Sequence, residues 1–426
     1  MTFIQKIKLV WRDKYLRSRL LFIAYMLVLF RLMAAIPIPG VDQGRLADLM
    51  DSTTGSFLGF LNLFSGGGIA GMSIVLLGVG PYITAAIIMQ LVGMMSERVK
   101  EMQRESEAGR KKIAMYSRAL SVPLAAMQGF GLMTLLQNQG VLGNLTTFEM
   151  ITSLVVVTAG SVLLMWIGEL ITEFGIGNGV SLIIFAGIVA SVPSQAIALW
   201  QNLQVDQTLL PIYVAFALLA FAVIYAIVYI TEAERPIPIQ YAKQARQGGR
   251  SIGGVQTYLP LRINQAGVIP IIFAMSVVVF PQMIASFLIS MDSASIQTAA
   301  ASVLEFLANP WYYGAIYFVL VFAFTYFYTA VTFDPVQISR NLQKSGAFVP
   351  GIRPGTQTQE YLGDVMTKIT LVGAIFLGVV AVLPVVIQGL TGIQSLAIGG
   401  TAILIVVSVV TDLIKKIDSQ ITMREY

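Results

Sequence analysis

The stretch GSFLGFLNLFSGGGIAGMSIVLLGVGPYITAAIIMQ, residues 55–90, holds two apolar segments of different length. Residues 57–64 make only about two helical turns, whereas a membrane-spanning helix needs about 20 apolar residues. The three glycines at 66–68 interrupt any helix, because each costs about 1 kcal/mol relative to alanine. Residues 73–95 are long enough to cross a bilayer. The stretch therefore predicts a short apolar piece placed between two spans.

The short piece has two interpretations. Irregular backbone at membrane depth is tolerated only where it is buried in protein or lines an aqueous cavity. A re-entrant segment that stops such a cavity fits this condition. The alternative is a surface helix lying at the outer membrane interface. The spacing alone does not choose between them.

Composition identifies a polytopic membrane protein. The 426 residues are 56% hydrophobic and 12% charged, about half the charged fraction of a soluble chain. The chain has no cysteine and no histidine, which excludes disulfides, thiol nucleophiles and imidazole acid–base chemistry. No nucleotide-binding motif is present either. No enzymatic activity, metal or cofactor is expected.

Hydropathy predicts ten membrane spans. The first begins after a basic segment, residues 1–19, whose apolar residues recur at helical spacing and favour an amphipathic surface helix. This first span ends in Pro-Ile-Pro-Gly rather than at a small-residue cleavage site, so no cleavable signal peptide is expected. The spans lie near residues 20–38, 73–95, 119–137, 151–171, 180–199, 209–230, 266–289, 312–331, 369–387 and 396–414.

Lysine and arginine alternate sharply between the loops on the two sides. The basic loops and flanks contain Arg98, Lys100, Arg104, Arg110, Lys111, Lys112, Arg118, Arg235, Lys243, Arg246, Arg250, Arg262, Arg340, Lys344, Arg353 and Lys368, and the tail adds Lys415, Lys416 and Arg424. On the opposite side Arg45 is the only basic residue. The positive-inside rule then places both termini in the cytoplasm.

Ten spans divide into two halves of five that enter the membrane from opposite sides, which permits an inverted repeat. The predicted fold is an all-α polytopic membrane protein with two inverted five-helix halves, into which the short apolar piece folds back as a re-entrant plug if it is the stopper of a cavity and not a surface helix. Its parts are a cytoplasmic amphipathic helix at 1–19, an N-terminal half at 20–205, a C-terminal half at 206–414 and a cytoplasmic tail at 415–426.

Other polar features were weighed against structural roles. The glycine pattern at 175–179 follows no strand, so it is interpreted as a tight turn and not as a nucleotide site. Arg31, inside the first span, is either functional or a boundary residue that reaches outward. Glu169 and Glu173 are interpreted as boundary residues. The long loops at 234–265 and 333–362 combine basic residues with glycine and proline, which favours ordered protrusions that bind an anionic protein or RNA surface.

Seven segments carry a resemblance to the SecY family of protein-conducting channels, over essentially the whole chain. They are FRLMAAIPIPGV (30–41), NLFSGG (62–67), GPYITAAIIMQL (80–91), MWIGELITEFGIGNGVSLIIFAGIV (165–189), LPLRINQAGVIPIIFA (259–274), TYFYTAVTFDPVQISRNLQKSGAFVPGIRPG (325–355) and MREY (423–426). The chain departs from the family pattern at Phe174, at Tyr258 and at the run 247–250, where the family usually has basic residues or histidine.

The resemblance implies a pore closed by a plug and by a ring of aliphatic side chains. The ring would be Val79, Ile83, Val180, Ile184, Ile272 and Ile405. The plug, at about 57–72, would include Phe57, Phe60, Leu61, Phe64, Gly66, Gly67 and Gly68. A lateral gate to lipid, between spans two and three and spans seven and eight, would include Thr84, Gln90, Asn264 and Phe280. Hydrogen bonds of the three polar residues among them would hold this seam shut. Docking of cytoplasmic partners would involve Arg246, Arg250, Arg340, Lys344 and Arg353.

The resemblance also implies the function. The chain would be the pore-forming subunit of a bacterial inner-membrane translocase that passes unfolded, signal-bearing polypeptides and releases transmembrane segments sideways into the lipid bilayer. Implied partners are SecE, a SecG-like subunit, the SecA motor ATPase and the translating ribosome. Two alternatives stay open, namely an ion-coupled solute transporter and a poreless insertase or scaffold. The scarcity of ionisable residues at the span centres disfavours the transporter.

Overall fold

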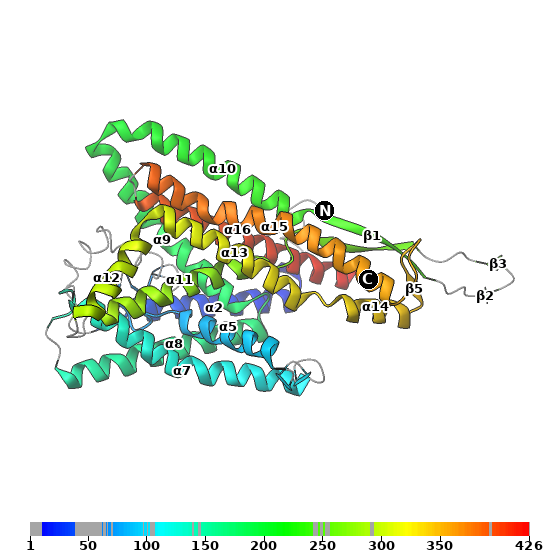
Figure 1. The fold of residues 1–426 in the computed structure, drawn as a ribbon, viewed down its shortest axis with the longest axis horizontal. Helices are drawn as coiled ribbons and strands as arrows, with labels where there is room; N and C mark the ends of the chain where they lie inside the picture. The colour runs from blue at the N-terminus through cyan, green and yellow to red at the C-terminus, as the bar shows by residue number, and fades with distance from the viewer. Residues whose placement is uncertain are drawn as a thin grey trace.

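Helices occupy all ten predicted spans (Figure 1). The computed structural model describes residues 11–38, 62, 65, 67–69, 71–96, 98–99, 101–102, 107–138, 140–143, 146–241, 246–247, 250–251, 256–289, 294–391 and 394–425. The ten helices are α2 (Lys14–Ala34), α5 (Gly80–Met95), α7 (Glu107–Asn138), α8 (Thr147–Phe174), α9 (Gly179–Val205), α10 (Leu210–Glu232), α11 (Ile269–Leu288), α13 (Pro310–Thr332), α15 (Thr356–Thr391) and α16 (Gln394–Glu425).

Six helical segments in the described part of the chain are long and apolar enough to cross a membrane. They lie at 111–137, 147–174, 179–205, 207–232, 310–344 and 356–391. Shorter apolar helices at 80–93 and 269–282 fall within α5 and α11. Together with the ten helical segments, this confirms a polytopic all-α membrane protein.

Two groups of helices meet along α11. On one side α7 packs against α5 and α8, and on the other α13 packs against α15, which in turn contacts α16. Helix α11 touches α13 as well as α5 and α7. One large hydrophobic cluster runs through both groups, with Phe30, Leu164, Ile184, Tyr317 and Ile405 among its buried side chains.

Helices α8 and α9 are joined by the tight turn predicted at 175–179. Gly177 has a φ of +99°, a left-handed conformation that glycine adopts without a steric cost. The side chain of Asn178 then caps α9 by accepting a hydrogen bond from the amide of Ser181 at 3.2 Å. The turn brings the two helices very close, because a Cβ added at Gly179 would lie 1.9 Å from the carbonyl oxygen of Gly168.

Helix α5 begins later than the predicted second span. Residues 73–79 form successive turns, and the helix starts at Gly80 with proline in its first turn. Ser73 instead forms an isolated β-bridge with Pro37, and the amide of Ile38 donates to the carbonyl oxygen of Met72 at 2.8 Å. These bonds to the segment after α2 hold the backbone away from the helical conformation.

Helix ends also differ from the predicted boundaries. Residues 1–10 of the predicted amphipathic helix lie outside the described residues, and residues 14–19 belong to α2, which Asp13 caps. Helix α15 begins about three turns before the predicted ninth span, and α16 continues to Glu425. Helix α12 (Ala294–Ala308) was not predicted at all.

The described parts of the two long basic loops pair with each other in one sheet, whereas residues 242–245, 248–249 and 252–255 of the first loop lie outside the described residues. Strand β1 (Glu234–Tyr241) pairs antiparallel with β4 (Gln256–Arg262) and also with β5 (Ala347–Phe348) from the other loop. Short strands β2 (Arg246–Gln247) and β3 (Arg250–Ser251) pair further out, and α14 (Pro335–Lys344) follows α13. Figure 1 shows these strands and α14 at one end of the helices, hereafter the strand end.

The opposite end carries α12 and the turn between α9 and α10 (Figure 1). In that turn Asp206 accepts hydrogen bonds from the hydroxyl and the amide of Thr208, at 2.7 and 2.9 Å. These two bonds lower the pKa of the Asp206 carboxyl, because they stabilise its charged form. The carboxylate therefore serves as a local cap of the next helix.

Candidate functional site

A cavity of about 1160 Å³ opens at the strand end between the two helix groups. Its wall is built by α5, α7, α8, α9, α11, α13 and α14. The mouth includes Glu173 and Asn178 from the α8–α9 turn and Asn341 from α14. The inner wall includes Ile83, Val180 and Ile272, which are three of the residues predicted to form the ring.

The structure brings all six predicted ring residues into one hydrophobic cluster. Five of them are at most 6% exposed, and Val180 is partly buried against the same cluster. They come from four helices. Val79 is the N-cap of α5 and Ile83 lies in that helix, while the others lie on α9 (Val180 and Ile184), α11 (Ile272) and α16 (Ile405). All six therefore belong to one hydrophobic cluster, and three of them also line the wall of the cavity.

The predicted plug is only partly described. Phe57, Phe60, Leu61, Phe64 and Gly66 lie outside the described residues. Gly67 has a φ of +88°, and a Cβ added there would lie 3.4 Å from Nη1 of Arg31, so that arginine, itself exposed, lies beside the glycines. A Cβ on Gly68 would lie 2.7 Å from the carbonyl oxygen of Val75. Gly68 is thus packed closely against backbone, whereas the neighbour of Gly67 is the side chain of Arg31.

The last part of the predicted plug packs as core. Ile69 and Met72 are each 1% exposed. They belong to a second hydrophobic cluster formed with side chains of α7, of residues 141–142 and of α8, including Leu132, Leu136, Val141, Leu142 and Val157. Neither lines the cavity.

The predicted gate residues do not hydrogen bond to one another across the seam. Thr84 donates to the carbonyl oxygen of Gly80 within its own helix at 3.1 Å. Asn264, 7% exposed, closes its own loop by accepting from the amide of Gly267 at 2.9 Å. Gln90 lines the cavity, and Phe280 is 39% exposed on α11. The expectation that polar pairs hold the seam shut is therefore wrong for Thr84 and Asn264, because backbone groups nearer in sequence occupy their side chains.

Helix α11 has neighbours on both of its sides. Helix α11 contacts α5 and α7 directly. On its other face Phe273 packs edge-on against Phe324 and Tyr328 of α13, with ring centroids 5.9 and 6.4 Å apart.

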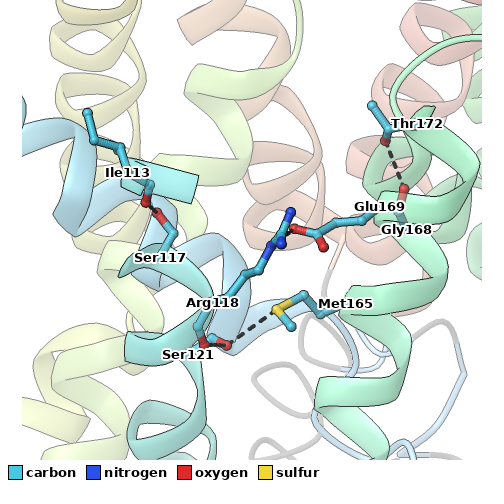
Figure 2. A network of polar contacts seen from close by, with 8 residues as sticks. All are labelled: Ile113, Ser117, Arg118, Ser121, Met165, Gly168, Glu169 and Thr172. Atoms are coloured by element: carbon cyan, nitrogen blue, oxygen red, sulfur yellow. Dashed lines mark hydrogen bonds and ion pairs between the residues drawn. The ribbon is translucent and has the colours of Figure 1, made fainter. Parts of the chain in front are cut away.

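An ion pair in the cavity wall escaped the sequence analysis. Nε of Arg118 on α7 lies 2.6 Å from Oε1 of Glu169 on α8 (Figure 2). One turn away, the hydroxyl of Ser121 donates to Sδ of Met165 at 3.5 Å, so two polar contacts join the same helices. Arg118 had been counted only among the loop charges and Glu169 only as a boundary residue, because nothing in the sequence pairs positions 51 apart.

The predicted docking residues lie at the strand end. Arg340 and Lys344 are exposed on α14, and Arg353 is exposed on the turn before α15. Arg246 and Arg250 lie on β2 and β3; their side chains are outside the described part of the structure. Phe174 is one of the positions where the chain departs from the family pattern. Its ring packs edge-on against that of Phe22 on α2, with the ring centroids 6.0 Å apart.

This arrangement of helices is that of a protein-conducting channel. A solved SecY structure, described as showing that the plug domain stabilises the closed state of the translocation channel, superposes with a TM-score of 0.65 at 18% identity, covering 93% of this chain and 91% of that one. Sec61 in the canine ribosome–channel complex gives a TM-score of 0.61 at 18% identity, covering the same fractions. These likenesses establish the fold.

The chain belongs to the SecY family. The SecY family model matches residues 73–414. The protein translocase subunit SecY of Corynebacterium glutamicum is 39% identical over 442 residues, which cover 98% of this chain and 97% of that protein. The family consists of protein-translocation channels and not of enzymes.

Proposed function

We propose that this chain is the pore-forming subunit of a bacterial Sec translocase. It passes unfolded, signal-bearing polypeptides across the inner membrane and releases transmembrane segments sideways between α5/α7 and α11/α13. Both termini and the strand end lie in the cytoplasm. The single observation that carries this proposal is that six aliphatic residues from four helices share one hydrophobic cluster, with three of them on the wall of one cavity.

The aliphatic ring works as a gasket in this account. A narrow apolar constriction excludes water and therefore blocks ions, because no polar group replaces their hydration shells. All six side chains are β-branched and stiff, so they keep a defined constriction. A polypeptide can still pass, since its side chains and the ring make non-directional contacts that require no fixed partner.

Energy must come from a partner. The proposed motor is SecA or the translating ribosome, which would dock on the exposed basic residues of the strand end, while SecE and a SecG-like subunit complete the complex in the membrane. The ordered sheet that joins the two loops supports this assignment, because docking on a fixed surface loses less conformational entropy than docking on a flexible one.

Reconstitution tests the proposal. The purified chain, placed in liposomes with SecE and SecA, should protect a secretory precursor from external protease when ATP is present. The same precursor without its signal sequence is the control. Saturable uptake of a small solute without precursor protection would identify a transporter instead. Insertion of membrane proteins with no translocation of secretory precursors would identify a poreless insertase.

A further inference from the structure

The contact between Arg118 and Glu169 is a partly exposed ion pair inside the cavity. The side chains are 47% and 23% exposed, and both residues line the cavity wall. The bond uses Nε of the guanidinium, and the two terminal nitrogens have no further partner among the described residues. Figure 2 shows the two side chains reaching toward each other from α7 and α8.

Such a pair is easily exchanged. Exposed ion pairs typically contribute little to stability, and this one lacks the two parallel bonds that make arginine–carboxylate pairs strong. A second cation that enters the cavity can therefore compete with Arg118 for the Glu169 carboxylate. Stabilising the fold is a minor part of what this pair contributes.

The charges of the cavity wall favour a cation. Among the lining residues that the structure describes, Arg118 is the one basic side chain, whereas Glu169, Glu173 and Asp334 are acidic. Asp334 already accepts bonds from the amides of Val336 and Gln337 as the cap of α14. Glu173 lies nearer the mouth, on the last turn of α8. Glu169 is the carboxylate closest to the gate helix α7, because it forms an ion pair with Arg118 on that helix.

We infer that Glu169 receives a lysine or arginine side chain of the entering polypeptide, which displaces Arg118 and removes one of the contacts between α7 and α8. This inference rests on the proposed function. Secretory signals begin with a positively charged region followed by 7–15 apolar residues. A cation held at Glu169 leaves the apolar part near the seam between α7 and α11. The ion pair thus couples recognition of the basic flank to the loss of one contact that holds the gate helix α7 to α8.

The test compares two precursors that differ only in the charge of the region before the apolar segment, one with lysines and one with glutamines there. Their translocation rates are measured with the full reconstituted complex. The readout is the rate for the basic precursor divided by the rate for the neutral one. With Glu169→Gln we expect this ratio to fall about two- to fivefold, the range that one partly exposed ion pair supports. With Arg118→Gln we expect the ratio to hold or to rise, because the competitor is removed.

Both substitutions break the same ion pair, so a purely structural role would change both variants alike. Equal changes in the ratio, or no change with Glu169→Gln, would overturn the inference. Glu234→Gln is the matched control, because it removes a 3.2 Å ion pair with Arg262 at the strand end outside the cavity. Should Glu169→Gln not accumulate, Glu169→Asp keeps the charge and should keep most of the ratio. Loss of translocation of both precursors in the wild-type complex would instead refute the proposed function.

Discussion

Arg353 stands on an ordered turn at the strand end. Gly351 and Gly355 on either side have φ values of +84° and +107°. The carbonyl oxygen of Arg353 accepts a bond from the hydroxyl of Thr358 at 2.9 Å, while its side chain is exposed. A guanidinium held in this way can bind a carboxylate or phosphate through two parallel bonds, which lysine does not reproduce.

We therefore predict that Arg353→Glu abolishes motor-driven translocation without affecting accumulation of the protein, and that Arg353→Lys is intermediate. Sign reversal adds repulsion to the loss of the bond. ATP-dependent precursor protection in liposomes measures the effect. Lys368→Glu is the control, because Lys368 is a 71% exposed residue that pairs with Asp364 one turn away. Wild-type protection with Arg353→Glu would make this residue an ordinary surface charge.

At this scale the sequence predicted residue types better than residue partners. The aliphatic ring was assigned by family resemblance. In the structure its members share one hydrophobic cluster, because each is an apolar residue on a helix that packs into the core. Asn264 was expected to bond across the gate, yet the amide of Gly267 is three residues away and takes its side-chain oxygen. The partner of Arg118 was missed because ion pairs between helices depend on their relative rotation, which hydropathy does not report.

Among the elements, α8 and α9 form the closest helix contact and make a direct stability test. A Cβ at Gly179 would lie 1.9 Å from the carbonyl oxygen of Gly168 and 2.8 Å from Cβ of Ile171. Gly179→Ala should therefore lower the unfolding free energy by about 1–3 kcal/mol, the usual cost of overpacking. Thermal unfolding in detergent measures the loss.

Gly80→Ala provides the matched control. Gly80 begins α5, and a Cβ added there would meet nothing within 4 Å. Alanine is also the better helix former, so the melting temperature should hold or rise slightly. Equal melting temperatures for the two variants would show that the α8–α9 contact is looser than described.

Element boundaries were the least predictable feature. Residues 73–79 are as apolar as the helix that follows, so hydropathy extends the second span over them. Their turn conformation depends on a bridge between Pro37 and Ser73 and on the positive φ of Gly78, +58°. Helix α12 was missed for the converse reason, because its 15 residues were too few to count as a span.

For the whole molecule, loop charge predicts which end faces the cytoplasm. Because the chain has no native cysteine, single cysteines report their side without background. A cysteine at Gln43 should react with an impermeant thiol reagent added outside intact cells, and a cysteine at Gln343 on α14 should react only after the cells are opened. The opposite pattern would invert the proposed orientation. The order of the helical segments was predictable because hydropathy is summed over long segments, whereas the shared cluster of residues 79 and 405 required the packed structure.

The central claim is that the aliphatic ring seals a pore, and bilayer conductance tests it most directly. The double variant Ile83→Ser with Ile405→Ser places two hydroxyls at the constriction, which should wet it and let ions through. The control is Ile188→Ser with Ile227→Ser, two isoleucines each 2% exposed in the same cluster but outside the ring. The account predicts ion currents through the ring variant and none through the control or the parent. A ring variant that folds and conducts no more ions than the control would contradict the claim that the ring seals a pore.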